Sequence, residues 1–533
     1  MATTAGGPPG GATGRGSFYR LRPHGWLGGP MLLYALLRVP AFLEPHWYTD
    51  EAGYVTTARG LLQGQVLYSQ VWNNKPPLHL WTVALVIQLM GTSEAVLHIL
   101  PFLTGGLTLL AVAYAGDRLL GRRRTVVALV GLAILLGTPL FDAELLLPES
   151  LLIAPVTWAG AILLTRIAAP DTRRWPLWPM AVGALVATGL AYQQTVLAET
   201  CAFGLILAIA GRASWRRVVV YAATLGALTA IWLVPAIITA GASKVGYALV
   251  GFYVNFTQVA YTGGASDVPV HLLIPAGVLV VLVAAAWLCR RDDDPLWALW
   301  VWAGAALLVP AVAREPYAHY LVPSLAPCAL AVTSLGLRWP ERITVSRRLA
   351  EVGLIAAAGL AVWPASVAGM DWLPTQAEPG HTLANYYGGA MSVLTRGRSL
   401  ITWQDDFDYR VPEDSAVAVW VQDHGLDGVP AVVWSSDAWL YELDNLQLVL
   451  PTPPIYNDEV LLGYSGPVAE EVAALGPVLV ITEGSARTAY PEIDSVLSSA
   501  YQQTDEVGSE IVWVRNDMVA SVTGPTGLGS PTG

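Results

Sequence analysis

The sequence is poor in charged residues. Asp, Glu, Lys and Arg make up only 13% of its 533 residues, whereas 54% are hydrophobic. Soluble domains average about 25% charged residues, so this composition excludes a soluble globular enzyme, and its hydrophobic content excludes a disordered chain. No polar segment carries a basic patch interleaved with aromatic residues, so nucleic acid is not an expected partner.

Cysteine and lysine are also scarce. The three cysteines, Cys201, Cys289 and Cys328, lie in apolar stretches, and their spacing fits neither a disulfide framework nor a metal site. Lysine occurs only at positions 75 and 244, against 27 arginines. A lysine in a loop of this chain is therefore unusual enough to be a candidate functional residue.

The charge is divided unevenly along the chain. Residues 1–369 carry a net charge of +7, whereas residues 370–533 hold 23 acidic and five basic residues, a net charge of −18. This asymmetry predicts an acidic domain over 370–515 joined to an apolar body over 23–369. Segments 1–22 and 516–533 are rich in small residues and proline, and we expect a disordered cytoplasmic tail and a second disordered tail there.

The apolar body contains eleven runs long enough to be candidate membrane spans, because a bilayer core of about 30 Å needs about 20 apolar residues per helix. The runs lie near residues 26–44, 96–117, 125–141, 149–168, 177–194, 197–211, 217–240, 270–289, 296–313, 317–337 and 350–369. Eleven spans with a cytoplasmic N-terminus put all five arginine-rich loops in the cytoplasm, as the positive-inside rule requires. If the apolar run 76–91 also crossed the membrane, every later loop would change sides and the arginine-rich loops would face outward. We therefore predict that this run forms a juxtamembrane or partly inserted helix.

The residues after Gly369 show a different pattern. Short apolar stretches at 430–434, 477–482 and 510–514 predict buried strands, and the segments around them predict helices, one of them capped by Asp414 or Ser415. The predicted fold class is an all-α polytopic membrane bundle of about eleven transmembrane helices with a small C-terminal extracytoplasmic α/β domain. The expected location is the cell membrane, surrounded by lipid.

An acidic pair, Asp50 and Glu51, follows the first span. A helix is expected to begin there and to include Tyr54 and Arg59, and acids in its first turn would interact favourably with the helix dipole. The alternative interpretation is a general base at the membrane surface that takes a proton from an attacking hydroxyl group. The sequence up to this point leaves both interpretations open.

Lys75 lies in the same predicted outer loop, directly before Pro76 and Pro77. It could be an interfacial lysine whose ammonium group extends towards water. It could also supply a point charge for a phosphate at the level of the lipid headgroups.

Further polar residues are predicted on the same face. Glu144 and Glu149 flank Pro148 at the start of a span, and ionisable groups close to the membrane core are functional candidates. Arg314, His319 and Tyr320 gather where another span begins. They could form an ordinary aromatic belt, or Arg314 and Tyr320 could donate hydrogen bonds to a phosphate.

Carboxylates, a lysine, an arginine and tyrosines from several spans thus converge on the outer face. A base, a hydroxyl acceptor and a phosphate leaving group would together perform glycosyl transfer with inversion. Nucleotide sugars are cytoplasmic, so an outward-facing site would use a lipid-linked donor.

The first outer loop, DEAGYVTTARGLLQGQVLYSQVWNNKPPLHLW, resembles that of family 39 glycosyltransferases and their relatives, the C-type superfamily that includes protein O-mannosyltransferases and the aminoarabinose transferase of lipid A. The stretch REPYAHYLVPSLAP is similar to another family segment. The resemblance implies a polyprenyl- or dolichyl-phosphate-linked sugar as donor and a hydroxyl group on a lipid, glycan or protein as acceptor.

The resemblance also implies roles for individual residues. Asp50 would be the catalytic base with Glu51 beside it, and Glu149 falls where family members often have an acid. Lys75 would hold the donor phosphate, with Arg314 and Tyr320 as further candidates. Asn74 stands where the aminoarabinose transferase has an acid near a metal, so no cofactor is certain, and a divalent metal is possible but not indicated.

Two alternatives remain open at this stage. A transporter or flippase of lipid-linked sugars would have as many spans, but it predicts charges through the midplane and discontinuous helices in paired halves. A non-catalytic relative would keep the scaffold and lose the base, and the presence of Asp50 weighs against it.

Overall fold

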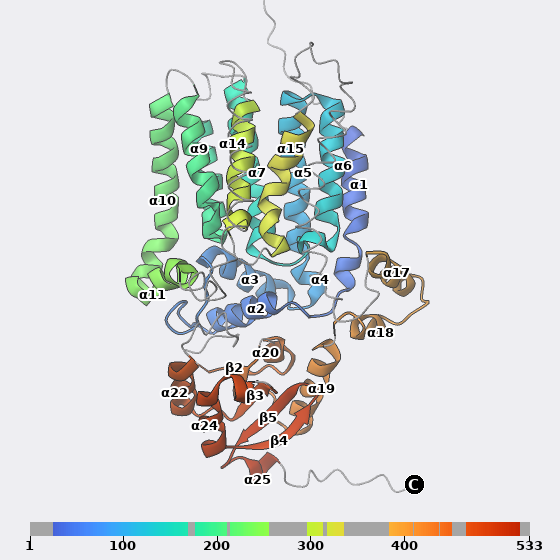
Figure 1. The fold of residues 1–533 in the computed structure, drawn as a ribbon, viewed down its shortest axis with the longest axis vertical. Coiled ribbons are helices and arrows are strands. Elements are labelled where there is room, and N and C mark those ends of the chain that lie inside the picture. Colours follow the sequence, from blue (N-terminus) through green and yellow to red (C-terminus); the bar gives the residue numbers. More distant parts are fainter. Residues whose placement is uncertain are drawn as a thin grey trace, which may run out of the picture.

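The computed structural model describes residues 25–168, 176–210, 214–254, 296–312, 317–334, 383–408, 410–435, 438–449, 465–484 and 486–522. Three layers follow one another along its longest axis (Figure 1). A bundle of long helices forms one end and a small α/β domain forms the other. A layer of shorter helices from the first loop lies between them.

The bundle consists of helices that run side by side (Figure 1). They are α1 (Gly28–Leu37), α5 (Ile99–Leu119), α6 (Arg122–Gly137), α7 (Pro148–Ala168), α8 (Leu177–Tyr192), α9 (Leu197–Ile209), α10 (Ser214–Ala240), α14 (Leu296–Val312) and α15 (Val322–Ser334). Large apolar side chains such as Leu32, Leu103 and Ile238 are 50–77% exposed on these helices. Apolar side chains on the outside of a bundle suit contact with lipid rather than with water.

Four helical stretches among the described residues are long and apolar enough to cross a membrane: Gly25–Leu43, Glu94–Leu119, Pro148–Ala168 and Trp215–Ala240. Four shorter apolar helices accompany them. The predicted count of eleven spans is therefore not confirmed, and two of the predicted runs, 270–289 and 350–369, lie outside the described residues. The turn between α5 and α6 lies at the end of the bundle away from α2 (Figure 1), which separates its arginines from the acidic pair.

The middle layer is built from the first loop. It contains η2 (Pro40–Leu43), α2 (Thr49–Leu62), α3 (Pro77–Met90) and α4 (Glu94–Leu97), and α11 (Ala242–Gly246) joins it at one side. The helix predicted after the acidic pair is thus confirmed as α2. α3 has only 14 residues, about 21 Å at 1.5 Å per residue, and lies beside α2 beyond the bundle. The predicted helix is therefore present, and its juxtamembrane or partly inserted position stays a prediction.

The C-terminal domain contains one five-stranded sheet in the order β2-β1-β3-β5-β4. Its strands are β1 (Pro430–Trp434), β2 (Gln447–Leu448), β3 (Leu479–Glu483), β4 (Tyr501–Val507) and β5 (Glu510–Arg515). β1 pairs in parallel with β2 and β3, whereas β5 is antiparallel to β3 and β4. The surrounding helices are α17 (Leu383–Leu394), α18 (Leu400–Asp405), α19 (Arg410–Asp423), α20 (Trp439–Leu443), α22 (Ser465–Leu475), α23 (Ala486–Ala489), α24 (Pro491–Ala500) and α25 (Val519–Val522).

Two details of the sequence prediction for this domain are wrong. α19 begins at Arg410, so Asp414 and Ser415 lie inside the helix; it is Asp408 that accepts a hydrogen bond from the Arg410 amide at 2.9 Å. The second tail was predicted to start at residue 516, but α25 follows, and its Val522 is buried. Val519 and Val522 lie in a stretch of small residues and pack one more helical turn against the domain.

The middle layer and the C-terminal domain share one hydrophobic core. Buried residues of α2 and α3, including Val55 and Leu80, belong to the same cluster as Val433 and Trp439 of the C-terminal domain. A separate cluster fills the helix bundle. The first loop is therefore packed on the outer domain, which helps to fix where its polar residues lie.

Candidate functional site

The acidic pair lies in the first turn of α2. Successive residues of an α-helix point about 100° apart, so the two carboxylates face different surroundings. Asp50 is half-buried, and the hydroxyl of Tyr54, one turn later, lies 3.4 Å from its Oδ2. Glu51 is buried and accepts a hydrogen bond from the backbone amide of Leu146. Burial, and then the charge of Glu94, raise the pKa of Glu51 well above its ordinary range.

Lys75 is held in place by the loop that precedes α3. Its backbone amide donates to Asn73 Oδ1 at 3.1 Å, and its carbonyl accepts a hydrogen bond from Tyr68 at 2.8 Å. The side chain is only 8% exposed, and its Nζ lies 5.9 Å from the centre of the Tyr54 ring. Tyr54 therefore touches Asp50 with its hydroxyl and faces Lys75 with its ring.

The ammonium group of Lys75 is stabilised by its surroundings. Burial lowers its pKa, but Tyr253, Asp50 and Glu149 oppose this effect, and the pKa of Lys75 ends above its ordinary value. A buried lysine kept charged in this way is suited to binding an anion.

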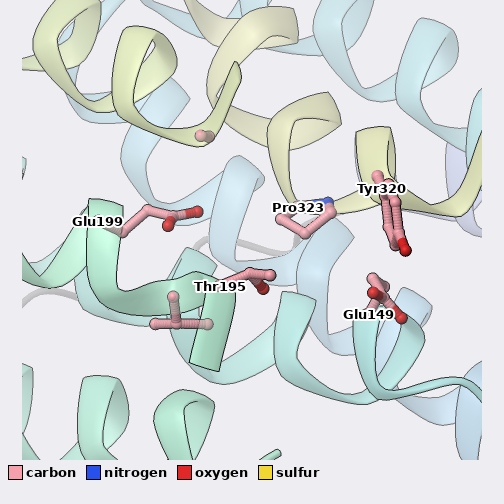
Figure 2. A pocket seen from close by; sticks show the side chains of 7 residues that line it. Glu149, Thr195, Glu199, Tyr320 and Pro323 are labelled. Atoms are coloured by element: carbon pink, nitrogen blue, oxygen red, sulfur yellow. The ribbon is translucent and has the colours of Figure 1, made fainter. Parts of the chain in front are cut away.

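Glu149 belongs to the same group of charges and begins α7. It is buried, and its Oε1 accepts a hydrogen bond from Gln193 at 2.5 Å. Glu149 also lines a cavity with about 280 Å³ of empty space (Figure 2). The cavity lies between the bundle helices, and its other lining residues are Thr195, Val196, Glu199, Ala306, Tyr320 and Pro323.

His319 lies close to this group. Its Nδ1 is 3.4 Å from Asp142 Oδ2 and 3.3 Å from the Tyr48 hydroxyl. The ring of Tyr320 packs edge-on against His319. The predicted candidates Asp50, Tyr54, Lys75, Glu149, His319 and Tyr320 are therefore gathered at one end of the bundle.

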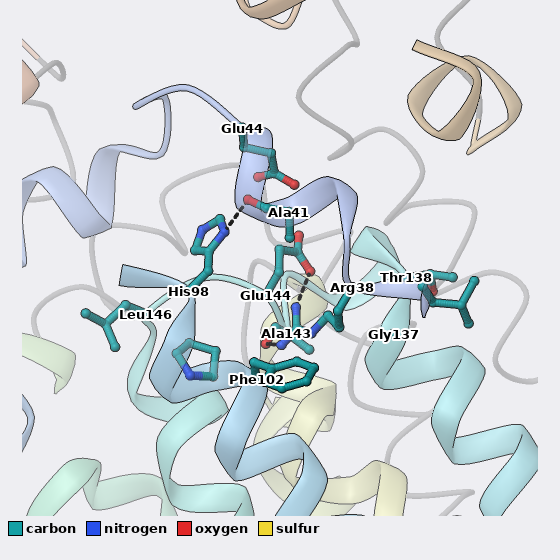
Figure 3. A network of polar contacts seen from close by, with 12 residues as sticks. Arg38, Ala41, Glu44, His98, Phe102, Gly137, Thr138, Ala143, Glu144 and Leu146 are labelled. Carbon is teal, nitrogen blue, oxygen red and sulfur yellow. Dashed lines mark hydrogen bonds and ion pairs between the residues drawn. The ribbon is translucent and has the colours of Figure 1, made fainter. Parts of the chain in front are cut away.

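Three other predicted candidates lie elsewhere. The Glu51 carboxylate turns towards Leu146 and Glu94. Glu144 is buried beside Arg38, whose Nη1 lies 3.5 Å away (Figure 3). Arg59 points to the outer domain, where it donates to Glu442 at 3.1 Å and to the carbonyl of Tyr441. Arg314 lies outside the described residues.

Several residues of the site were not among the candidates from the sequence. Tyr253 adds to the charge environment of Lys75, and Asn73 and Tyr68 fix its backbone. Gln193 holds Glu149. The tyrosines carry no local signal, because 21 of them occur in the chain. Asn73 stands two residues before Lys75, and an Asn at that spacing is a recognisable turn former.

This geometry defines a membrane protein with a cluster of buried and half-buried charged residues where the helices of the first loop meet an apolar bundle. Residues 74–238 match the family model "Dolichyl-phosphate-mannose-protein mannosyltransferase". No curated protein sequence matches significantly.

Solved structures extend the likeness to the whole chain. ArnT from Cupriavidus metallidurans bound to undecaprenyl phosphate is 15% identical, and the match covers 95% of this chain and all of ArnT with a TM-score of 0.59. Its apo state gives a TM-score of 0.58 at 15% identity, covering 94% of this chain and 98% of ArnT. An Archaeoglobus fulgidus oligosaccharyltransferase is 10% identical, covering 93% of this chain and 76% of its own, with a TM-score of 0.48. The predicted resemblance is confirmed to this extent: residues 74–238 match the mannosyltransferase family model, and the chain has the fold of ArnT.

Proposed function

We propose that this chain is a membrane glycosyltransferase that moves one sugar from a polyprenyl- or dolichyl-phosphate donor to a hydroxyl group of a lipid, glycan or protein at the outer membrane face. The observation that carries the proposal is the placement of Asp50 and Lys75 on either side of Tyr54. A base and a buried cation side by side are what displacement of a sugar from a phosphate needs.

In the proposed reaction, the Asp50 carboxylate accepts the proton of the acceptor hydroxyl. The hydroxyl oxygen forms a bond to the anomeric carbon as the bond from that carbon to the phosphate oxygen breaks. Attack from the face opposite the phosphate inverts the anomeric configuration. Asp50 is half-buried, so it remains accessible to an acceptor from outside.

The leaving phosphate is proposed to lie at Lys75, whose charge would balance the negative charge that develops on it. Tyr320 lies close enough to contribute to the electrostatic environment of Lys75 and lines the cavity, so it is a second candidate donor to the phosphate.

The lipid nature of the donor is supported by two features. The proposed site adjoins a helix bundle whose surface is apolar, so a donor embedded in the membrane would lie close to it. The ArnT structure with the same fold is described as bound to undecaprenyl phosphate. A soluble nucleotide sugar would not need an apolar surface beside its binding site.

Replacement of Asp50 by asparagine tests the proposal. Asn keeps the shape and removes the base, so transfer of labelled sugar from a polyprenyl-phosphate donor should fall about 10²–10⁴-fold. Binding of the donor should not weaken, because the change removes a negative charge that acts on Lys75 and leaves the ammonium group in place. Asp117→Asn on the exposed surface of α5 is the matched control.

Two results would contradict the proposal. Transfer at the normal rate by the Asp50→Asn variant would remove Asp50 as the base. A product that retains the anomeric configuration would exclude a single displacement. Movement of intact lipid-linked sugar between leaflets without any transfer would instead favour a flippase.

A further inference from the structure

Three ionisable side chains outside the proposed site come together where α2 meets α4. Glu51 belongs to α2, Glu94 begins α4, and His98 follows α4 directly. Their exposed fractions are 1%, 5% and 1%. One ligand-type atom from each lies within 4.8 Å of the others.

These side chains leave polar atoms without a hydrogen bond. Among the described residues, Glu51 Oε2, both Glu94 carboxylate oxygens and His98 Nε2 make no hydrogen bond of good geometry, and the polar atoms nearest to them belong to one another and to His46. An unsatisfied polar group inside a protein costs free energy, and an unpaired buried charge costs much more. Four such atoms at one point require either a bound cation or a proton shared between the two carboxylates.

The tautomer of His98 follows from its other contact. His98 Nδ1 lies 2.6 Å from the carbonyl oxygen of Ala41, which can only accept, so Nδ1 carries the proton (Figure 3). Nε2 then presents a lone pair 3.5 Å from Glu94 Oε1. Metal-binding histidines typically donate their second ring N–H to a backbone carbonyl in this way.

His46 does not neutralise the cluster. Its Nε2 lies 3.4 Å from Glu94 Oε2, but the same atom is 2.8 Å from the carbonyl of Thr92 and directs its proton there. Two carboxylates and an imidazole lone pair therefore face one another.

We propose that Glu51, Glu94 and His98 bind a divalent cation, and that zinc fits them best. One imidazole nitrogen and two carboxylate oxygens are a ligand set that zinc accepts, with a fourth position left for water. This site is distinct from the position of Asn74, where the sequence argues against a metal. The cation would tie α2 to α4 one residue after Asp50, and so would hold the proposed base in place.

The metal content of the full-length protein tests this proposal. Protein purified in detergent without chelators and then incubated with zinc chloride should retain about one zinc per chain after desalting. Glu94→Gln and His98→Ala should each lose most of it. Glu199→Gln is the control, because Glu199 is a buried acid in α9, away from this cluster, and its replacement should leave the zinc in place.

Two measurements on the unaltered protein keep the test independent of how the variants fold. Removal of the metal by dipicolinate should lower the midpoint of thermal unfolding, and zinc should restore it. Cobalt bound in place of zinc should give visible absorption bands of a low-symmetry N/O site. No bound zinc, manganese or calcium in the unaltered protein would overturn the proposal. A Glu94→Gln variant that is more stable than the original and keeps the same metal content would also overturn it, and would indicate two carboxylates that share a proton.

Discussion

Replacing Lys75 by methionine should weaken binding of a polyprenyl phosphate while leaving the fold intact. Methionine keeps most of the length and apolar volume of the lysine stem, so the packing against the Tyr54 ring is largely retained. The change removes a charge that is only 8% exposed. A hydrogen bond to a charged group contributes about 1.5–3 kcal/mol, which corresponds to about 10–150-fold in affinity.

The structure indicates that the loss should be towards the upper end of this range. Asp50 and Glu149 both act on Lys75, so without the ammonium group they would repel an incoming phosphate. The assay is equilibrium binding of labelled polyprenyl phosphate without a sugar to protein in lipid nanodiscs. Lys244→Met is the matched control, because Lys244 is the second lysine of the chain and is exposed. Equal affinity of Lys75→Met and Lys244→Met would refute the reasoning, and Lys75 would then be a buried charge without a role in binding the phosphate.

Two further predictions concern the outer domain. Arg59→Ala removes the hydrogen bonds from α2 to Glu442 and the Tyr441 carbonyl, so amide hydrogen exchange in α20 should accelerate. Unchanged exchange in α20 would show that the apolar contacts alone hold the outer domain on α2. Burial, and then Asp427, raise the pKa of Asp444 to about 7 from an ordinary value of 3.8. The folded state therefore holds the proton more tightly, and the thermal midpoint of the outer domain should fall as the pH rises from about 4 to about 7. Asp444→Asn should flatten that profile, and an equally steep profile in the variant would assign the titration to another group.

The first loop is the part of the site that the sequence predicts best. The acids at the start of a helix and the lysine before two prolines are local patterns, and their helix and loop are confirmed. The spacing also suggests that Tyr54 lies one turn after Asp50, where it can reach the carboxylate. These relations are short in sequence, so local periodicity is enough to recover them.

The roles of adjacent or distant acids are harder to predict. Glu51 follows Asp50 directly, yet its environment is set by Leu146, which is 95 residues away. Glu144 was grouped with the outer-face acids, but it is buried beside Arg38, 106 residues before it in the chain. A sequence shows that an acid is present, whereas only the tertiary structure shows which charge compensates it.

Strand β4 shows the same limit in the outer domain. It reads YQQTDEV and was not predicted, because its residues are mostly exposed and lack the alternation of a half-buried strand. It forms the edge of the sheet and pairs only with β5. An edge strand can be polar on both faces because its neighbour supplies the hydrogen bonds. The residues of β4 alone therefore do not predict a strand, and only the pairing with β5 shows it.

The placement of Asp50 depends on contacts at both ends of α2. Near its start, Glu51 accepts a hydrogen bond from Leu146 of the segment that leads into α7. Near its end, Arg59 binds the outer domain. A base must be held close to its productive position by surrounding residues, since a displacement of about 1 Å can reduce a rate about 100-fold. Because α2 is fixed from the bundle on one side and from the C-terminal domain on the other, a change in either should alter the turnover rate without touching Asp50 itself.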